Sequence, residues 1–245
     1  MPFVRALRRK NPNNSIFKIV WYEFIRITTW LVGYTLYRHR WWYGHRIPSK
    51  GPVLLVSNHQ SFYDPPFIGV GIMNRHIHWL ARSGLFKSGI AAGLLRSLNA
   101  FEIEQGKGDV KAIKQSIRVL GDDHLMCVFP EGTRTENGAL HEFQKGVLIL
   151  IRKAKPAIVP MAIEGLHDIW PLTKKVPGLR GRSGVMYGEP IDPEMIIQMP
   201  PDEALEFLTR QVETLRLDLR NRLRTASDAR YPKPGPGDYS SVPLD

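Results

Sequence analysis

The stretch from Val53 to Phe67, VLLVSNHQSFYDPPF, joins a short apolar run to a turn rich in polar side chains. The first part, Val53 to Ser57, has the composition of a strand buried on both faces. The polar run from Asn58 to Asp64 ends this strand, and a helical pattern resumes after two prolines. In α/β proteins, ligand sites tend to lie where strands end in this way.

Strands and helices are expected to alternate along the rest of the chain. Periodicity predicts strands at 125–129, 157–163 and 185–187, and helices at 109–120, 145–154 and 202–224. The last helix carries acidic residues in its first turn and an apolar stripe, which indicates core packing: Leu205, Leu208, Val212, Leu215, Leu219 and Leu223. The alternation predicts an α/β fold with a central mixed sheet flanked by helices.

The composition excludes several classes of protein. The chain has 245 residues, 43% hydrophobic and 23% charged, so it can bury a core and does not resemble a disordered protein. A single cysteine, Cys127, excludes a disulfide framework and a cysteine-based metal cluster, and fits a reducing compartment. We interpret it as a buried side chain in the strand at 125–129.

The net charge of +11 points to a polyanionic partner, either nucleic acid or an anionic membrane. Residues 1–50 hold ten basic side chains and one acidic side chain, whereas residues 51–245 carry a net charge of only +2. A nucleic-acid-binding body would need basic residues of its own, so we expect no nucleic-acid partner.

The N-terminal segment also holds four of the six tryptophans, and residues 16–43 have a helical pattern. One side is apolar, with Ile16, Ile19, Val20, Phe24, Ile27, Leu31 and Tyr34, and the other holds Lys18, Tyr22, Arg26, Thr29 and Gly33. The longest uncharged run, residues 27–37, has 11 residues, too few to span a bilayer. No small-residue cleavage site of a secretory signal follows it.

Basic, tryptophan-rich amphipathic helices favour the membrane interface, where cations meet anionic lipid. The alternative is a helix packed on its own domain with a solvated basic face. We expect membrane-binding helices in residues 1–48, an α/β catalytic domain in 49–228 and a mobile, Pro/Gly-rich tail without regular structure in 229–245.

His59 and Asp64 are the first candidates for chemistry. Their spacing of five through a turn lets the Asp64 carboxylate reach one imidazole nitrogen, which leaves the other as a general base. A His–Asp pair alone is weak evidence, because most such pairs are plain hydrogen bonds.

The second candidate is Phe129-Pro130-Glu131-Gly132-Thr133-Arg134, which also follows an expected strand. Gly132 permits close backbone approach, Thr133 offers a hydroxyl, and Arg134 offers a planar guanidinium suited to phosphate. In isolation this is no more than a turn with a surface arginine. Together with His59 and Asp64, about 70 residues earlier, it is far more specific.

The two motifs together resemble the glycerolipid acyltransferases, over roughly residues 50–190, with Pro160 matching a fourth motif and Gly188-Glu189-Pro190 extending the likeness. The resemblance implies that His59 deprotonates an acceptor hydroxyl, that Asp64 orients His59, and that no acyl-enzyme forms. It implies that Glu131, Gly132, Thr133 and Arg134 frame the acceptor, with Arg134 on its phosphate. The acyl donor would be acyl-CoA or acyl-carrier protein and the acceptor a lysophospholipid or glycerol phosphate, with no other cofactor and no metal.

One departure concerns the family's second motif, which usually ends in arginine. Here Gln105 stands at that position, and an amide cannot neutralise a phosphate. Either Arg82 or Lys107 supplies the missing charge, or the acceptor differs from lysophosphatidic acid. Of the two, Arg82 is favoured, because family members often carry a basic residue after the first motif.

Two alternatives remain open: an acyltransferase for a glycolipid or amino-acid lipid, and a non-catalytic lipid-binding protein. Intact His59 and Asp64 disfavour the second. The basic residues Lys174, Lys175, Arg180 and Arg182 lie in a loop that either meets the phosphates of coenzyme A or is simply solvated. We interpret His76 and His78 as surface histidines. We expect the protein to lie on the cytoplasmic face of the cell membrane.

Overall fold

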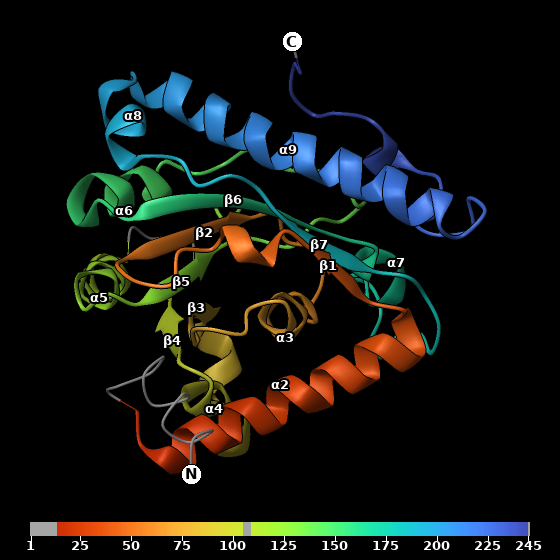
Figure 1. The fold of residues 1–245 in the computed structure, drawn as a ribbon, viewed down its shortest axis with the longest axis horizontal. Helices are drawn as coiled ribbons and strands as arrows, with labels where there is room; N and C mark the ends of the chain where they lie inside the picture. Colours follow the sequence, from red (N-terminus) through yellow and green to blue (C-terminus); the bar gives the residue numbers. More distant parts are fainter. Residues whose placement is uncertain (1–13, 105–108, 245) are drawn as a thin grey trace.

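A computed structural model describes residues 14–104 and 109–244. In this part of the chain, seven strands form one sheet in the order β1-β7-β6-β2-β5-β3-β4 (Figure 1). The strands are β1 (Arg40–Trp42), β2 (Val53–Ser57), β3 (Ile77–Arg82), β4 (Ala100–Ile103), β5 (Leu125–Val128), β6 (Ala157–Glu164) and β7 (Gly184–Tyr187). The helices are α2 (Ile16–Tyr37), α3 (Asp64–Val70), α4 (Gly89–Ser97), α5 (Val110–Gly121), α6 (Gly146–Ala154), α7 (Leu166–Ile169), α8 (Pro193–Gln198) and α9 (Pro201–Thr225).

The sheet is mixed, as the sequence predicts. Strands β6, β2, β5, β3 and β4 run parallel, whereas β7 pairs antiparallel with β6 and parallel with β1. The C-terminal ends of β2, β5 and β3 therefore meet at one edge of the sheet. All five residues of β2, at the centre, are buried, which explains its continuous apolar sequence.

Helices cover both faces of the sheet (Figure 1). Side chains from α2, α3, α4 and α7 pack with one face of β2, β5 and β6, and side chains from α5, α6, α8 and α9 pack with the other. Within β2, Leu55 belongs to the first layer, and Leu54 and Val56 belong to the second. The expected α/β architecture is confirmed.

The first helix ends earlier than the sequence predicts. It stops at Tyr37 because Arg38 adopts the left-handed conformation, with φ of 45°, and caps the helix. Residues 40–42, expected to be helical, instead form β1 at the edge of the sheet. The prediction of a helix extending to Tyr43 is therefore wrong.

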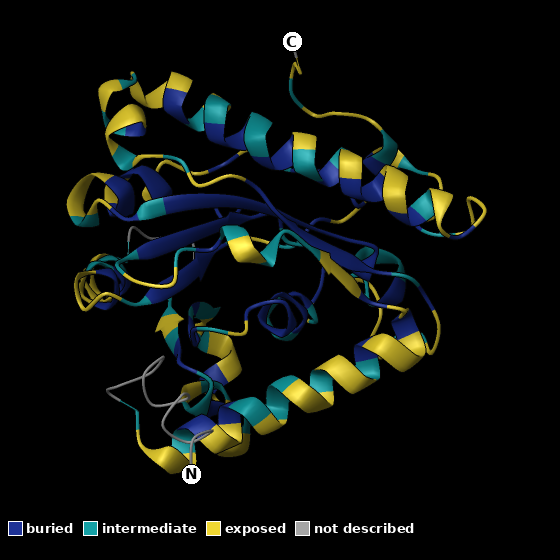
Figure 2. Cartoon of the chain, viewed as in Figure 1, coloured by how far each residue is buried: buried dark blue, intermediate teal, exposed yellow. Residues whose placement is uncertain are grey.

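In α2 the polar side faces the protein and the apolar side faces outward, which is the reverse of a helix packed on a hydrophobic core. The polar side packs on the body, where Tyr22 and Gly33 are buried. Most of the apolar side is exposed, including Val20 at 56%, Phe24 at 57% and Leu31 at 53% (Figure 2). Among the described residues, no helix combines the length and hydropathy needed to cross a membrane.

The C-terminal region holds two further differences from expectation. The buried face of α9 includes Glu213, Arg216 and Arg220 as well as the predicted apolar residues. Residues 236–238 form a short 3₁₀ turn where no regular structure is expected, and Arg220 Nε donates to Asp238 Oδ1 at 2.7 Å.

The interpretation of His76 as a surface residue is also wrong. His76 is only 4% exposed, and its ring stacks on Tyr22 of α2 with 3.9 Å between centroids. His78, on β3, is half-buried and lies against His124, with 4.6 Å between ring centroids.

Candidate active site

His59 and Asp64 lie together just beyond the C-terminal end of β2. His59 Nδ1 is 2.6 Å from Asp64 Oδ2, and this oxygen also accepts hydrogen bonds from the backbone N–H groups of Gln60 and Ser61, at 2.5 and 2.9 Å. The Asp64 side chain is fully buried, whereas that of His59 is 20% exposed. The turn therefore fixes the carboxylate, and the carboxylate fixes the imidazole with its other nitrogen accessible.

The imidazole is held on its face by Phe129. The two rings stack at 4.0 Å between centroids with 14° between their planes. Phe129 directly follows β5, the neighbour of β2 in the sheet. The parallel pairing of the two strands thus brings the His59 turn and the residue 129–134 loop together.

Glu131 connects the two motifs through its buried carboxylate. Oε1 accepts the backbone N–H of His59 at 2.6 Å, and Oε2 accepts that of His141 at 2.9 Å. Burial raises the pKa of Glu131 to about 8, although both of these hydrogen bonds favour the charged form. Glu131 therefore holds the backbone under His59, and both its oxygens are already engaged by the protein.

The next two residues of the motif have separate roles. Gly132 has φ of +72°, and a Cβ atom there would lie 2.5 Å from Nε2 of Gln144, which donates to the Glu131 carbonyl at 3.2 Å. The positive φ therefore favours glycine, and a larger residue would also displace the Gln144 amide. Thr133 is exposed beside it.

Arg134 is half-buried, with its guanidinium carbon 3.5 Å from the centroid of the Phe62 ring. Burial lowers the pKa of Arg134, the Asp64 carboxylate opposes this, and the positive charge of Arg82 adds to it. Its Nη1 is buried and has no hydrogen-bond partner in the described part of the chain. Arg82, at the end of β3, is exposed. The positive charge of Arg82 therefore affects the guanidinium group of Arg134.

Pro160 lies apart from these side chains. It is buried in β6 opposite Val56, and its carbonyl accepts the Gly188 N–H at 2.7 Å. A Cβ atom on Gly188 would lie 2.9 Å from Pro160 Cγ and 3.0 Å from Leu215 of α9, which places the proline ring on the α9 face of the sheet. This position indicates a structural contact between β6 and the Gly188 turn. Gln105 and Lys107 lie outside the described residues.

Several residues that support the site have no role assigned to them from the sequence. The Asn58 side chain exchanges two hydrogen bonds with the backbone of Ile163, both at 2.9 Å, and so ties the His59 turn to β6. His141 and Gln144 support Glu131 from ten and more residues away. Their partners are set by the path of the chain, so spacing alone does not identify them.

No group of three or more His, Cys, Asp or Glu side chains arranged to hold a metal ion occurs within residues 14–104 and 109–244. The polar groups at the carboxyl edge include an imidazole held by a carboxylate and two guanidinium groups. Such a set can accept a proton from a hydroxyl and bind an anion beside it.

The sequence model of the Acyltransferase family matches residues 42–164, half of the chain, and spans both motifs. The chain belongs to this family. It is 25% identical over 177 residues to the 1-acyl-sn-glycerol-3-phosphate acyltransferase of Bacillus subtilis (strain 168), covering 72% of this chain and 85% of that protein. It is 28% identical over 208 residues to the 1-acyl-sn-glycerol-3-phosphate acyltransferase alpha of Bos taurus, covering 81% and 66% of the two chains.

A solved structure has the same fold. The crystal structure of the 1-acyl-sn-glycerophosphate acyltransferase from Thermotoga maritima superposes with a TM-score of 0.68 at 22% identity, over 95% of this chain and 90% of that one. The protein is therefore an acyltransferase on family grounds, with a mixed α/β fold shared with this structure.

Proposed function

We propose that this acyltransferase transfers a fatty acyl group from acyl-CoA or acyl-carrier protein to the hydroxyl of 1-acyl-sn-glycerol-3-phosphate at a membrane surface. The observation that carries the proposal is the His59–Asp64 pair, held at 2.6 Å beside the Glu131–Arg134 loop. The names of the relatives from Bacillus subtilis and Bos taurus support the choice of acceptor.

The proposed chemistry needs one base and no enzyme nucleophile. Nε2 of His59 makes no hydrogen bond to any described residue, whereas Nδ1 is bound to Asp64. The acceptor hydroxyl gives its proton to Nε2 as its oxygen attacks the thioester carbonyl. The tetrahedral intermediate then expels the thiolate, which takes the proton from the imidazolium, so ester and thiol are the products. General-base catalysis of this kind contributes about 10²–10⁴-fold.

Ser57 and Ser61 support the absence of an acyl-enzyme. Ser57 is buried and donates to the Asn58 carbonyl at 3.0 Å, and Ser61 Oγ donates to the Trp170 carbonyl at 2.9 Å. Both hydroxyls are engaged by the backbone, and neither is hydrogen-bonded to His59.

The acceptor phosphate is assigned to Arg134 and Arg82. The positive charge of Arg82 contributes to lowering the pKa of Arg134, and a dianion between the two guanidinium groups would relieve this repulsion. Arg82 thus supplies the positive charge that an arginine at position 105 would provide. We assign Glu131 to holding the His59 backbone and not to contact with the acceptor.

Membrane association is assigned to α2. The helix has an exposed apolar side, and Trp21 Nε1 donates to Ser97 Oγ of α4 at 2.9 Å. On α4, Ile90 is 90% exposed. Apolar surface of this extent is unfavourable in water and suits the acyl region of a lipid interface. We place the enzyme on the cytoplasmic face of the membrane, where anionic lipid complements its basic N-terminal region.

The experiment is an acceptor panel assayed with radiolabelled acyl-CoA in detergent: 1-acyl-sn-glycerol-3-phosphate, glycerol 3-phosphate, an amino-acid lipid and a glycolipid with a free hydroxyl. We expect transfer to the first, and a gain for phosphate acceptors in Gln105→Arg. Transfer to the glycolipid or amino-acid lipid with none to either phosphate acceptor would contradict the proposed acceptor while leaving the reaction class intact.

A further inference from the structure

Residues 171–182, between α7 and β7, form a loop that exposes apolar side chains between basic ones. Val176 is 71% exposed and Leu179 is 78% exposed. Lys174, Lys175 and Arg180, which flank them, are also exposed and form no ion pair with any described acidic residue. Exposed aliphatic side chains bordered by unpaired cations are typical of segments that enter the interface of an anionic membrane.

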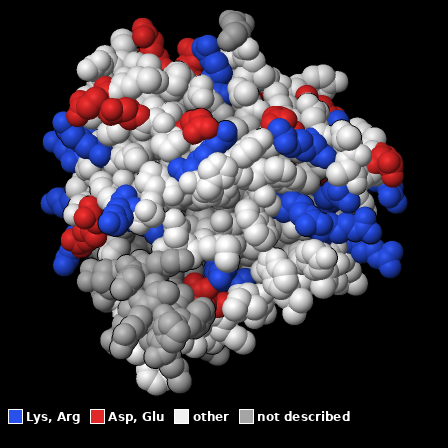
Figure 3. All heavy atoms as spheres, viewed as in Figure 1, with Lys and Arg blue, Asp and Glu red and all other residues white. Residues whose placement is uncertain are grey.

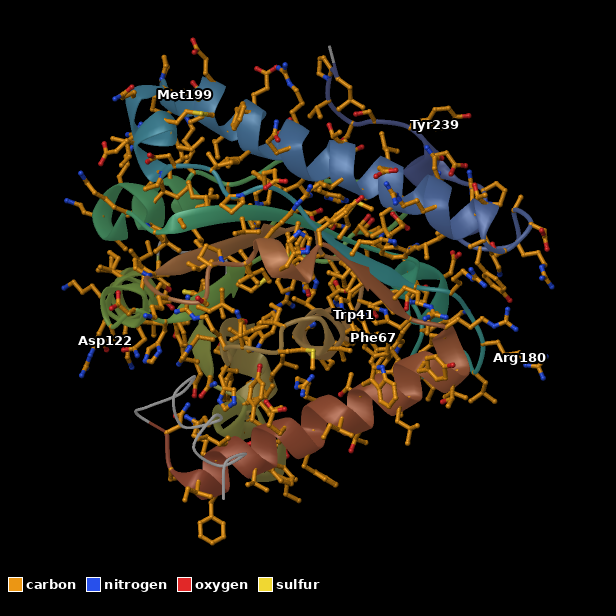
Figure 4. The ribbon with its side chains drawn as sticks, in the orientation of Figure 1. Trp41, Phe67, Asp122, Arg180, Met199 and Tyr239 are labelled. Carbon is orange, nitrogen blue, oxygen red and sulfur yellow. The ribbon has the colours of Figure 1, made fainter. Side chains whose placement is uncertain are left out.

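The loop lies at the C-terminal end of α2. The hydroxyl of Tyr37, the last residue of α2, donates to the Gly178 carbonyl at 3.0 Å, and the Ser183 N–H donates to the Tyr37 carbonyl at 3.1 Å. Figure 4 labels Arg180 at this end of the helix. The exposed loop thus adjoins α2, whose apolar side is also exposed.

Positive charge is concentrated at the same end of the molecule (Figure 3). Burial lowers the pKa of Arg182, and the guanidinium groups of Arg38, Arg40 and Arg230 lower it further, whereas Asp228 opposes them. A cluster with this excess of cations favours an anionic partner.

The loop is also joined directly to the His59 turn. Its base is Trp170, whose carbonyl accepts Ser61 Oγ at 2.9 Å and whose ring contacts Tyr63 and Phe62 with centroids 4.8 and 5.3 Å apart. These residues lie between His59 and α3 in sequence. Trp170 therefore connects the loop to the His59 turn through direct contacts.

We propose that residues 171–180 form a second membrane-inserting element. Val176 and Leu179 enter the lipid interface, and the basic side chains beside them contact anionic headgroups: Lys174, Lys175 and Arg180. Trp170 then holds the His59 turn at the lipid surface. This inference rests on the proposed membrane association and extends it from one helix to two separate contacts. Two separate contacts fix the orientation of the enzyme relative to the membrane, whereas a single helix on the surface leaves rotation about its axis free.

The experiment measures insertion at a single labelled position in the full chain. Because Cys127 is buried, Val176→Cys provides a selectively reactive thiol for an environment-sensitive fluorophore. The matched control is Tyr239→Cys, since Tyr239 is 76% exposed and lies on the α9 side of the molecule (Figure 4). Both proteins are mixed with vesicles containing phosphatidylglycerol, and binding is measured separately by flotation.

We expect the label at 176 to shift to shorter emission wavelength and to be quenched by spin-labelled lipid, and the label at 239 to do neither. Flotation without a change at 176 would overturn the inserting loop but leave the membrane proposal standing. Absence of flotation in both the labelled and the unmodified protein would overturn both proposals.

A second variant tests the effect on catalysis. Val176→Asp combined with Leu179→Asp is expected to reduce turnover of vesicle-embedded acceptor about tenfold, since each side chain loses its transfer into an apolar environment. Turnover of detergent-dispersed acceptor should stay within about twofold. Equal turnover of vesicle-embedded acceptor by variant and wild type would contradict the loop's proposed role.

Discussion

At the scale of single residues, Asp64 is the side chain on which the orientation of His59 depends. Its Oδ2 accepts from the imidazole and from two backbone N–H groups at once. Oδ1 is buried without a hydrogen-bond partner among the described residues, so one oxygen performs all the positioning. The carboxylate therefore fixes both the ring and its tautomer.

Asp64→Asn should lower kcat by about 10²–10⁴-fold with little change in KM, because the amide cannot favour the imidazolium that forms in the transition state. Steady-state kinetics on detergent-dispersed acceptor would measure this. A variant whose loss lay entirely in KM would indicate that Asp64 acts on acceptor binding instead.

Glu131 gives a prediction about stability and pH. Burial raises its pKa from the usual 4.5 to about 8, so the folded protein retains a proton that the unfolded chain releases across this interval. The contribution of this side chain to stability is therefore complete below about pH 4.5 and is lost as the pH rises through about 8.

Glu131→Gln removes this titration, and its amide can accept only one of the two backbone N–H groups. We expect a cost of about 1–3 kcal/mol for the unpaired donor. The difference in unfolding free energy between wild type and variant should fall as the pH is raised from 5 to 8, measured by urea denaturation. A difference that stayed constant over this range would show that Glu131 is an ordinary low-pKa carboxylate, already ionised in both states above pH 5.

At the scale of elements, α9 shows what patterning predicts and what it misses. Its leucine stripe predicts the buried face, and Leu208, Val212, Leu219 and Leu223 are buried. Arg216 is also buried, and it donates to Glu213 at 2.6 Å and to Glu164 of β6 at 3.3 Å. From the sequence alone, charged residues on a helix are predicted to be exposed to solvent. The contact with Glu164, which lies 52 residues earlier, is set by the tertiary fold.

Arg216→Met should destabilise the protein by about 3–5 kcal/mol, because it leaves Glu213 buried without its cation and removes one of the two arginines paired with Glu164, the other being Arg220. The control Arg118→Met removes an exposed arginine, 77% accessible, that lies 4.0 Å from Asp122, and should cost less than about 1 kcal/mol. Chemical denaturation of both variants measures the contrast. Equal losses would mean that the buried network contributes no more than a surface pair.

The strand ends at the candidate site were more predictable. The residues of both motifs could be identified from the sequence, because apolar runs end abruptly at Asn58 and Pro130. Their contact depends on β2 and β5 being adjacent, and no local pattern gives strand order. Glu131 was expected at the acceptor, but its oxygens bind the backbone, since the loop curls back toward His59.

At the scale of the whole molecule, the orientation of α2 is the feature that periodicity leaves undetermined. A hydrophobic period of a helix reveals two faces but not which of them meets the protein. Here the polar side packs on the body, where the hydroxyl of the buried Tyr22 accepts the Ile77 N–H at 3.2 Å. The apolar side is left on the surface, and α2 is hydrogen-bonded to α4 through Trp21 and to the loop at 171–182 through Tyr37.

Phe24→Asp combined with Leu31→Asp should weaken binding to phosphatidylglycerol vesicles at least tenfold, because both side chains are more than half exposed and belong to the apolar side of α2. The melting temperature should change by less than about 3 °C, since neither side chain packs in the core. The control Thr214→Asp with Asn221→Asp adds the same charge to exposed positions of α9. Similar losses in both variants would indicate a general charge effect.

The most direct test of the account is the initial rate of acyl transfer from radiolabelled acyl-CoA to 1-acyl-sn-glycerol-3-phosphate by His59→Ala, compared with wild type at equal concentrations of folded protein. We expect a loss of about 10²–10⁴-fold with no acyl group retained on the protein, because His59 is the only base in the proposed reaction. A rate within twofold of wild type would contradict it.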